Sequence, residues 1–343
     1  EEAILLGRKA FVLGGKTALE VVRDKLEASL AEKGISCEFA TFTGFCSPEK
    51  IDAYTELFLE SGADFVIGVG GGRAIDTAKG ITYRTNACIM CIPTSVAQCA
   101  CYANVIILYR DNGDPLPYAW NLIQPVNVIL VDTDIIVRKC PVRMLSTGIA
   151  DSMAKQVEIE FLRTVLPAWS ENFLSTYSYQ MANNIWQWNM EHAKKACIDA
   201  EHGLITPEVE AAICISLMLT GFSSGLAYGC RQIAFAHNLY YAMCIYCKDI
   251  QQKYMHGEIV SMGLPLQMML NRAKQEEIDR LIQFLQGIGA PVYPEDIGFA
   301  PTAEILEDIL GYCYAQMPFL SAEDKKVMKN SLSNFWFHQT AHV

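Results

Sequence analysis

The stretch GVGGGRAIDTAK, residues 68–79, sets three consecutive glycines between the apolar run DFVI and the expected start of a helix. Glycines at the end of a strand permit a tight turn, and they also let a ligand approach the backbone closely. Ligands of open α/β sheets bind at the carboxyl ends of strands, where a helix N-terminus offers free N–H groups to a phosphate. The glycines alone do not separate these two interpretations.

Strand and helix signals alternate throughout the first part of the chain. Predicted helices are TALEVVRDKLEASLAEKG, SPEKIDAYTELFLESG and RAIDTAKGITYR. Predicted strands are KAFVLGG, CEFATFTG, DFVIGVGGG, ACIMCIPTS, NVIILYRDNGDP with a turn at Asn112–Gly113, and NVILVDTDII. Repeated strand–helix units predict a mostly parallel sheet with helices on both faces.

After Pro141 the strand signals nearly vanish and long helical periods dominate, as in PEVEAAICISLMLTGF and EEIDRLIQFLQGIG. We therefore expect an α/β domain at residues 1–141 and an all-helical domain at residues 142–343.

Composition excludes several classes of protein. The net charge of −11, with no dense Lys/Arg block, argues against binding of nucleic acid or anionic membrane. No uninterrupted apolar stretch looks long enough to span a bilayer. The 13 cysteines are scattered through apolar runs, which indicates buried free thiols and a cytoplasmic location. The pairs Cys88/Cys91 and Cys244/Cys247 are expected to pack in the core rather than bind a metal.

Five motifs occur in order: GVGGGRAIDTAK, IPTSVA, STGIADSMAK, FAHNLYYAM and YMHGEIVSMG. In this order they resemble the metal-dependent, iron-containing alcohol dehydrogenase family that includes glycerol dehydrogenase, whose fold is shared more distantly with dehydroquinate synthase. The resemblance covers almost the whole chain. It implies a dinucleotide-binding domain, a helical metal-binding domain and an active site between them, with a small alcohol, polyol or its carbonyl form as substrate. We also expect a homo-oligomer.

The resemblance implies a role for particular residues. Asp151, His237 and His256 match the metal ligands, and Glu258 is either a partner of these ligands or an ordinary helix residue. Residues matching the NAD or NADP site are Gly15, Gly70, Gly71, Gly72, Arg73, Asp76 (placed at the helix start), Thr94, Ser95, Val105 and Tyr109. One carboxylate and two imidazoles suit a borderline cation and leave a position open for substrate. We expect Zn²⁺ in preference to Fe²⁺.

Three departures from the family pattern carry information. Lys155 stands where members with four ligands have a histidine, so three ligands are expected. Cys99 replaces the acidic residue that contacts the polyol, which predicts poor use of glycerol. Gly15 replaces the acid that holds the adenosine ribose, which predicts acceptance of NADP(H), with Lys16 as a possible contact.

Three other functions remain open. A dehydroquinate synthase-like lyase or a glycerol-1-phosphate dehydrogenase would need several basic residues near the metal, and the sequence offers Lys155, Arg231, Lys248 and Lys253. A nucleotide-binding protein without turnover is the third possibility, and retention of all three ligand types argues against it.

Overall fold

The chain divides into two compact units, Glu1–Pro141 and Val142–Val343, which are described one at a time. The computed structural model describes residues 1–227 and 233–337. Arg231, one of the basic residues considered above, lies outside these ranges.

The first unit is built on a five-stranded parallel sheet with the order β2-β1-β3-β4-β7. The strands are β1 (Lys9–Gly15), β2 (Ser36–Phe42), β3 (Phe65–Gly70), β4 (Cys88–Pro93) and β7 (Val128–Ile129). The central strands β1, β3 and β4 are almost entirely buried, as apolar runs covered on both faces should be. Because all pairings are parallel, the carboxyl ends of β1, β3 and β4 lie at the same edge.

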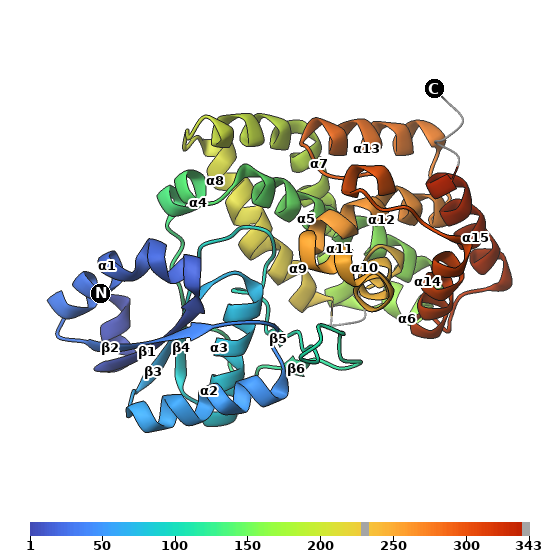
Figure 1. Ribbon diagram of the computed structural model, residues 1–343. Helices are drawn as coiled ribbons and strands as arrows, with labels where there is room; N and C mark the ends of the chain where they lie inside the picture. Colours follow the sequence, from blue (N-terminus) through green and yellow to red (C-terminus); the bar gives the residue numbers. More distant parts are fainter. Residues whose placement is uncertain (228–232, 338–343) are drawn as a thin grey trace. The chain divides into compact units, whose positions relative to one another are not determined.

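Helices cover both faces of this sheet. Figure 1 shows α1 (Lys16–Glu32) on one face, with α2 (Pro48–Ser61) and α3 (Gly72–Thr85) on the other. The sequence signals act as predicted at α2, where the Ser47 hydroxyl accepts from the Lys50 N–H and Gly62 ends the helix in the left-handed conformation. A short 3₁₀ turn, η1 (Glu2–Leu5), precedes the sheet.

Two predicted strands differ from the structure. Of the expected strand in NVIILYRDNGDP, only β5 (Val105–Ile106) forms, and it pairs antiparallel with β6 (Trp120–Asn121) outside the main sheet. The expected strand NVILVDTDII ends as β7 at Ile129, because the Asp132 side chain caps a new helix, α4 (Thr133–Lys139). A carboxylate that accepts N–H groups at a helix start outweighs the β-preference of the isoleucines that follow.

The second unit is helical, and no strand occurs among its described residues. Its helices are α5 (Val142–Val165), α6 (Pro167–Ser170), α7 (Phe173–Glu201), α8 (Pro207–Cys214), the π segment η2 (Ile215–Leu219), α9 (Thr220–Leu226), α10 (Phe235–Tyr246), α11 (Lys248–Lys253), α12 (His256–Leu270), α13 (Gln275–Gly287), the 3₁₀ turn η4 (Pro294–Ile297), α14 (Ala303–Gln316) and α15 (Ala322–Phe337). Helix α12 packs against α5 and α10, which brings the segments carrying the three predicted ligands together.

One apolar run differs from expectation. Residues Pro207–Leu226 are long and apolar enough to cross a membrane by length and composition alone, with a mean hydropathy of 1.6. Within this run, 56% of the most apolar window is buried inside the protein. A core helix of a soluble protein passes the same test, so the run carries no evidence for a membrane span.

Candidate functional site

Three helices of the second unit each contribute one side chain to a cluster. Asp151 lies in the middle of α5, His237 in the first turn of α10, and His256 is the first residue of α12. The Asp151 Oδ1 atom is 3.3 Å from His237 Nε2 and 3.1 Å from His256 Nε2. Their potential ligand atoms all lie within 4.8 Å of one another. Two imidazole nitrogens and a carboxylate oxygen in this arrangement suit a divalent zinc or iron ion.

Glu158 fixes the chemical form of His237. The fully buried Glu158 carboxylate lies 2.5 Å from His237 Nδ1. A carboxylate only accepts hydrogen bonds, so Nδ1 carries a proton, which leaves Nε2, directed at Asp151, as the ring nitrogen available to a metal ion. The same carboxylate accepts from the backbone N–H groups of Ala234 and His237, both at 2.9 Å, and thus satisfies the buried start of α10.

A close approach between helices sets the position of His256. A Cβ atom at Gly257 would lie 2.2 Å from the Thr147 carbonyl oxygen, so only glycine lets the start of α12 pass α5 this closely. Beside it, the Glu258 carboxylate accepts from the Met255 N–H at 2.8 Å and forms a two-point ion pair with Arg143. Glu258 therefore anchors the first turn of α12 rather than contacting a ligand side chain directly.

The charges within the cluster shift each other's protonation. Burial alone would raise the pKa of Asp151, but the two histidines and Lys155 hold that pKa well below 3.8. Burial lowers the pKa of His256 below 6.5, which keeps this imidazole neutral near pH 7. Burial alone would lower the pKa of His237, but the neighbouring carboxylates of Glu158 and Asp151 have the larger combined effect and raise this pKa above 6.5.

Lys155 is the fourth polar side chain of the cluster. It lies one turn after Asp151 in α5 and is 5% exposed. Its Nζ atom is 3.5 Å from His237 Nε2. The position therefore places a buried ammonium beside the three candidate ligands.

In the first unit, the predicted glycines meet at the carboxyl ends of neighbouring strands. Gly70 ends β3 with a φ of +123°, which a side chain would rarely permit, and a Cβ there would be 3.8 Å from the Gly15 nitrogen. The Thr94 N–H donates to the Gly70 carbonyl at 3.2 Å, and Ser95 lies beside Gly71. Gly71 caps α3 without a side-chain bond, so the N–H groups of the first turn keep their anion-binding capacity.

The surroundings of the other two glycines differ. A Cβ at Gly72 would lie 1.7 Å from the Gln98 Nε2 atom, at the end of a flexible side chain that lies over the start of α3 and could move aside. A Cβ at Gly71, in contrast, would meet only Ser95, at 3.9 Å. Of the three positions, only Gly70 has a backbone conformation that a side chain would rarely permit.

Arg73 and Tyr109 are joined by an aromatic ring that the sequence did not reveal. The Arg73 guanidinium stacks 4.3 Å from the centre of the Phe45 ring, and the Phe45 and Tyr109 ring centres are 5.7 Å apart. The Tyr109 N–H donates to the Cys46 carbonyl, which fixes its backbone beside Phe45. Arg73 and Tyr109 thus belong to one cluster.

Asp76 lies one turn into α3 and is buried, so its predicted place at the helix start needs correction. Its Oδ1 atom is 2.7 Å from the fully buried Lys79 Nζ, and its Oδ2 atom accepts from the Ile107 N–H. The Lys79 ammonium donates to the carbonyls of Ala100, Ala103 and Val105, at 2.6–3.0 Å. Asp76 and Val105 therefore belong to an internal support of the loop that carries Cys99.

Comparisons with known proteins agree with this arrangement. The family described as iron-containing alcohol dehydrogenase matches residues 1–133. A glycolaldehyde reductase of Halobacterium salinarum is 26% identical over 309 residues, which are 89% of this chain and 82% of the relative. A glycerol dehydrogenase of Thermotoga maritima is 27% identical over 312 residues, covering 90% and 82%. The crystal structure of glycerol dehydrogenase from Schizosaccharomyces pombe shares the fold, with a TM-score of 0.83, 23% identity and coverage of 98% and 86%.

Residues 1–133 match the iron-containing alcohol dehydrogenase family, and the relatives that align with most of the chain carry glycerol dehydrogenase and glycolaldehyde reductase names. These comparisons support a metal-dependent dehydrogenase of the alcohol or glycerol type, a class for which the family implies a nicotinamide cofactor and a divalent metal ion. The predicted fold class, an α/β dinucleotide-binding part followed by a helical part, is confirmed by the solved structures with the same fold.

Three residues near the predicted positions of this dehydrogenase escaped the sequence analysis. Glu158 lies seven residues after Asp151 on the same helix, and this spacing was the available signal. Phe45 and Gln98 lie in irregular segments that carry no periodic signal. Cys99 is half-buried in the loop after β4, where its carbonyl accepts from the N–H groups of Tyr102 and Ala103.

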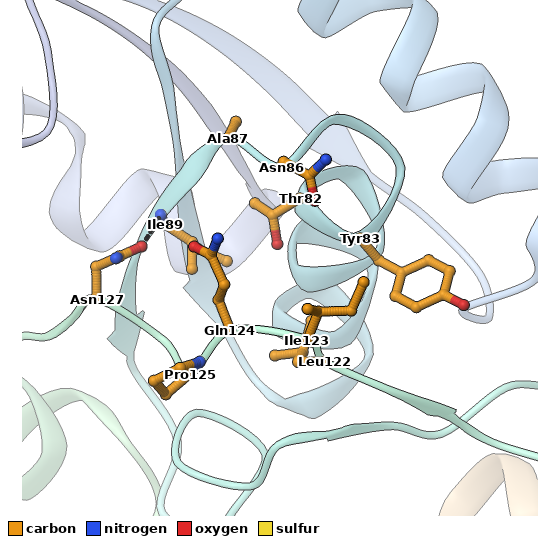
Figure 2. Close-up of a pocket in the computed structure, with 10 residues that line it drawn as sticks. All are labelled: Thr82, Tyr83, Asn86, Ala87, Ile89, Leu122, Ile123, Gln124, Pro125 and Asn127. Atoms are coloured by element: carbon orange, nitrogen blue, oxygen red, sulfur yellow. Dashed lines mark hydrogen bonds between the residues drawn. The ribbon is translucent and has the colours of Figure 1, made fainter.

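A pocket of the dehydrogenase lies elsewhere in its first unit. Figure 2 shows it beside the amino end of β4, where the Ile89 N–H donates to the Asn127 amide oxygen at 2.8 Å. It is lined by Thr82, Tyr83, Asn86, Ala87, Ile89, Leu122, Ile123, Gln124, Pro125 and Asn127. None of the predicted site residues lines it, because they follow the carboxyl ends of the strands.

Replacing Lys79 with Met should lower the free energy of unfolding by about 3–5 kcal/mol, because Asp76 and three backbone carbonyls lose their buried partner. Urea denaturation of the first unit, followed by circular dichroism, measures the loss. Lys16→Met, at the exposed start of α1, is the control and should change stability by less than about 0.5 kcal/mol. The double variant Asp76→Asn with Lys79→Met should cost less than the sum of the single changes, and strict additivity would contradict the ion pair.

Proposed function

We propose that this dehydrogenase binds one divalent cation through Asp151, His237 and His256 and transfers hydride between a nicotinamide dinucleotide and a small alcohol or its carbonyl form. The observation that carries the proposal is the close approach of the three ligand atoms, together with the Glu158 contact that leaves the His237 Nε2 lone pair free. A cation with an open position lowers the pKa of a bound alcohol and polarises a bound carbonyl.

Each protein group has a separate task in this proposal. Asp151 supplies the anionic ligand, and His256 supplies a neutral imidazole. Glu158 keeps the proton on Nδ1 of His237, which orients the ring and makes its other nitrogen more basic. The turn at Gly70–Gly72 and the first N–H groups of α3 hold the pyrophosphate of the dinucleotide.

We propose zinc as the preferred ion, although the family is named for iron. Two imidazoles and a carboxylate accept either metal, and a site with nitrogen and oxygen ligands generally binds Zn²⁺ more tightly than Fe²⁺. Restoring metal-free protein with each ion separately, and comparing affinity and turnover, decides between them.

The alternative reactions receive less support from the charges. A phosphorylated substrate needs several cations, and Lys155 is the one basic side chain for which a contact with a candidate ligand, His237, is found among the described residues of the helical unit. A nucleotide-binding protein without turnover would not need the ligand atoms of Asp151, His237 and His256 gathered within 4.8 Å. The proposal of a cytoplasmic enzyme is consistent with buried thiols such as those of Cys46, Cys91 and Cys313. A homo-oligomer remains part of the proposal, to be tested by analytical ultracentrifugation.

Replacing Glu158 with Gln should weaken metal binding about 10- to 100-fold, because His237 loses the carboxylate that fixes its orientation. His256→Ala should abolish stoichiometric binding and activity. Competition with a chelator and elemental analysis of Zn²⁺-supplied protein measure both effects. His202→Ala, on a half-exposed histidine at the end of α7, is the control. Wild-type protein that binds no stoichiometric cation would refute the proposed site.

The cofactor preference should follow from position 15. A Cβ at Gly15 meets no atom within 4 Å, so an aspartate fits there without a clash. The wild type lacks an acid that repels a 2′-phosphate, so we expect NADP(H) to bind within tenfold of NAD(H). Gly15→Asp should weaken NADP(H) by at least tenfold and leave NAD(H) unchanged or improved. Fluorescence titration measures both, and Gly15→Ser serves as an uncharged control.

The substrate preference should respond to position 99. Cys99 offers a polyol only a weak hydrogen-bond partner, whereas a carboxylate accepts from two hydroxyls. Cys99→Asp should therefore raise kcat/KM for glycerol, relative to a simple alcohol, by roughly ten- to a hundredfold, if this residue faces the substrate. Cys99→Ala controls for loss of the thiol. An unchanged ratio in a folded, metal-loaded variant would assign Cys99 a packing role.

A further inference from the structure

Lys155 is buried among the candidate metal ligands, yet the proposed reaction gives it no task. Its only hydrogen-bond partner within residues 1–227 and 233–337 is His237 Nε2, at 3.5 Å. Glu158 holds a proton on Nδ1, so in the neutral ring Nε2 is the acceptor that the lysine N–H can use.

A metal ion at the three ligands would use the lone pair of that same nitrogen. The two interactions exclude each other, because a single ring nitrogen has one lone pair in the plane of the ring. Once a cation is bound, the ammonium needs another acceptor, since an unpaired buried charge is strongly unfavourable. Lys155 is only 5% exposed, so bulk water does not readily supply that acceptor.

The net charge of the metal-loaded cluster also indicates that an anionic ligand binds beside Lys155. Asp151 and Glu158 contribute two negative charges, while Lys155 and a divalent cation contribute three positive charges. The neighbouring Arg143–Glu258 pair is neutral and adds nothing to the balance. A loaded site therefore carries one excess positive charge, which a monoanionic ligand neutralises.

We propose that Lys155 determines substrate specificity by binding the carboxylate of a 2-oxo acid or of the corresponding 2-hydroxy acid. This inference rests on the proposed function and names the substrate class of the same site. The Lys155 Nζ atom lies 3.5 Å from the ring nitrogen that would hold the metal, so an anionic group bound by Lys155 would lie close to the reacting oxygen, as it does in a 2-oxo acid. A phosphate placed further along the substrate does not meet this condition.

The reaction is balanced as follows. Hydride passes from NAD(P)H to C2 of the 2-oxo acid, the C2=O π bond breaks, and the oxygen takes a proton that derives from solvent. The products are the 2-hydroxy acid and NAD(P)⁺, and the carboxylate is unchanged. Lys155 binds this carboxylate throughout and exchanges no electrons.

The kinetic test compares two substrates that differ at one group. Pyruvate carries a carboxylate where hydroxyacetone carries a hydroxymethyl group. In the metal-loaded protein, Lys155→Met should lower kcat/KM for pyruvate about 10- to 100-fold more than it lowers kcat/KM for hydroxyacetone, as expected for loss of a charge-assisted hydrogen bond to the carboxylate. Equal losses for both would overturn the inference and assign Lys155 a positioning role, for example toward the second oxygen of Asp151.

Control variants keep the test decisive. Lys194→Met removes a charge from an exposed site of α7 in the same unit and should change neither substrate. If Lys155→Met does not fold, Lys155→Gln retains hydrogen-bonding capacity without the charge and should give the same selective loss. Metal content is measured in every variant, so weaker metal binding is not mistaken for weaker substrate binding.

A binding experiment separates this inference from the proposed function. Oxamate has the shape and carboxylate of pyruvate but is not reduced. Calorimetry with zinc-loaded protein should show binding to the wild type and at least tenfold weaker binding to Lys155→Met. If the wild type reduces hydroxyacetone but neither reduces pyruvate nor binds oxamate, only the inference fails. If no carbonyl compound is reduced, the proposed function fails, and the oxamate result alone supports or overturns the role of Lys155.

Discussion

The hydrogen bonds accepted by the Glu158 carboxylate support both the folding of the helical unit and the orientation of a candidate metal ligand. The carboxylate accepts two backbone N–H groups at the buried start of α10, and there it also fixes the proton on Nδ1 of His237. A buried helix start without such an acceptor would be costly, so this structural requirement itself orients the imidazole. Asp151 and Glu158, seven residues apart, lie on the same side of α5 and act on opposite nitrogens of one ring.

In the α/β unit, a buried cation rather than a buried anion forms hydrogen bonds with backbone groups. The Lys79 ammonium uses its three N–H groups on the carbonyls of the segment that follows β4, and its charge faces Asp76. The backbone after β4 runs irregularly as far as the short strand β5, which pairs with β6 outside the main sheet. A single buried cation supplies the missing hydrogen bonds, and it thereby fixes the loop after the predicted PT motif without regular secondary structure.

Sequence patterns predicted the structural features that depend on local chemistry, such as helix caps, or on apolar periodicity. The parallel strands, the capped α2 and the helical second half follow from such signals, and the ligand triad followed from the family resemblance. The contacts of Gln98 with Gly72 and of Phe45 with Arg73 join irregular segments to a helix start, and no periodicity marks them. The early end of β7 could have been recognised, because Asp132 is a good N-cap residue. Gly257 could not be explained from the sequence, because a glycine is required there by the Thr147 carbonyl of another helix.

The two buried lysines show how a structural charge differs from a functional one. Lys79 has an acceptor for each of its three N–H groups, all from backbone carbonyls whose positions do not depend on a ligand. Lys155 relies, within the described residues, on a histidine nitrogen that a bound metal would occupy. Folding alone accounts for the first lysine, because its removal would leave unsatisfied groups within the protein. Among the described residues the second lysine has no acceptor left once a metal occupies that nitrogen, which is the property expected of a residue that recognises substrate.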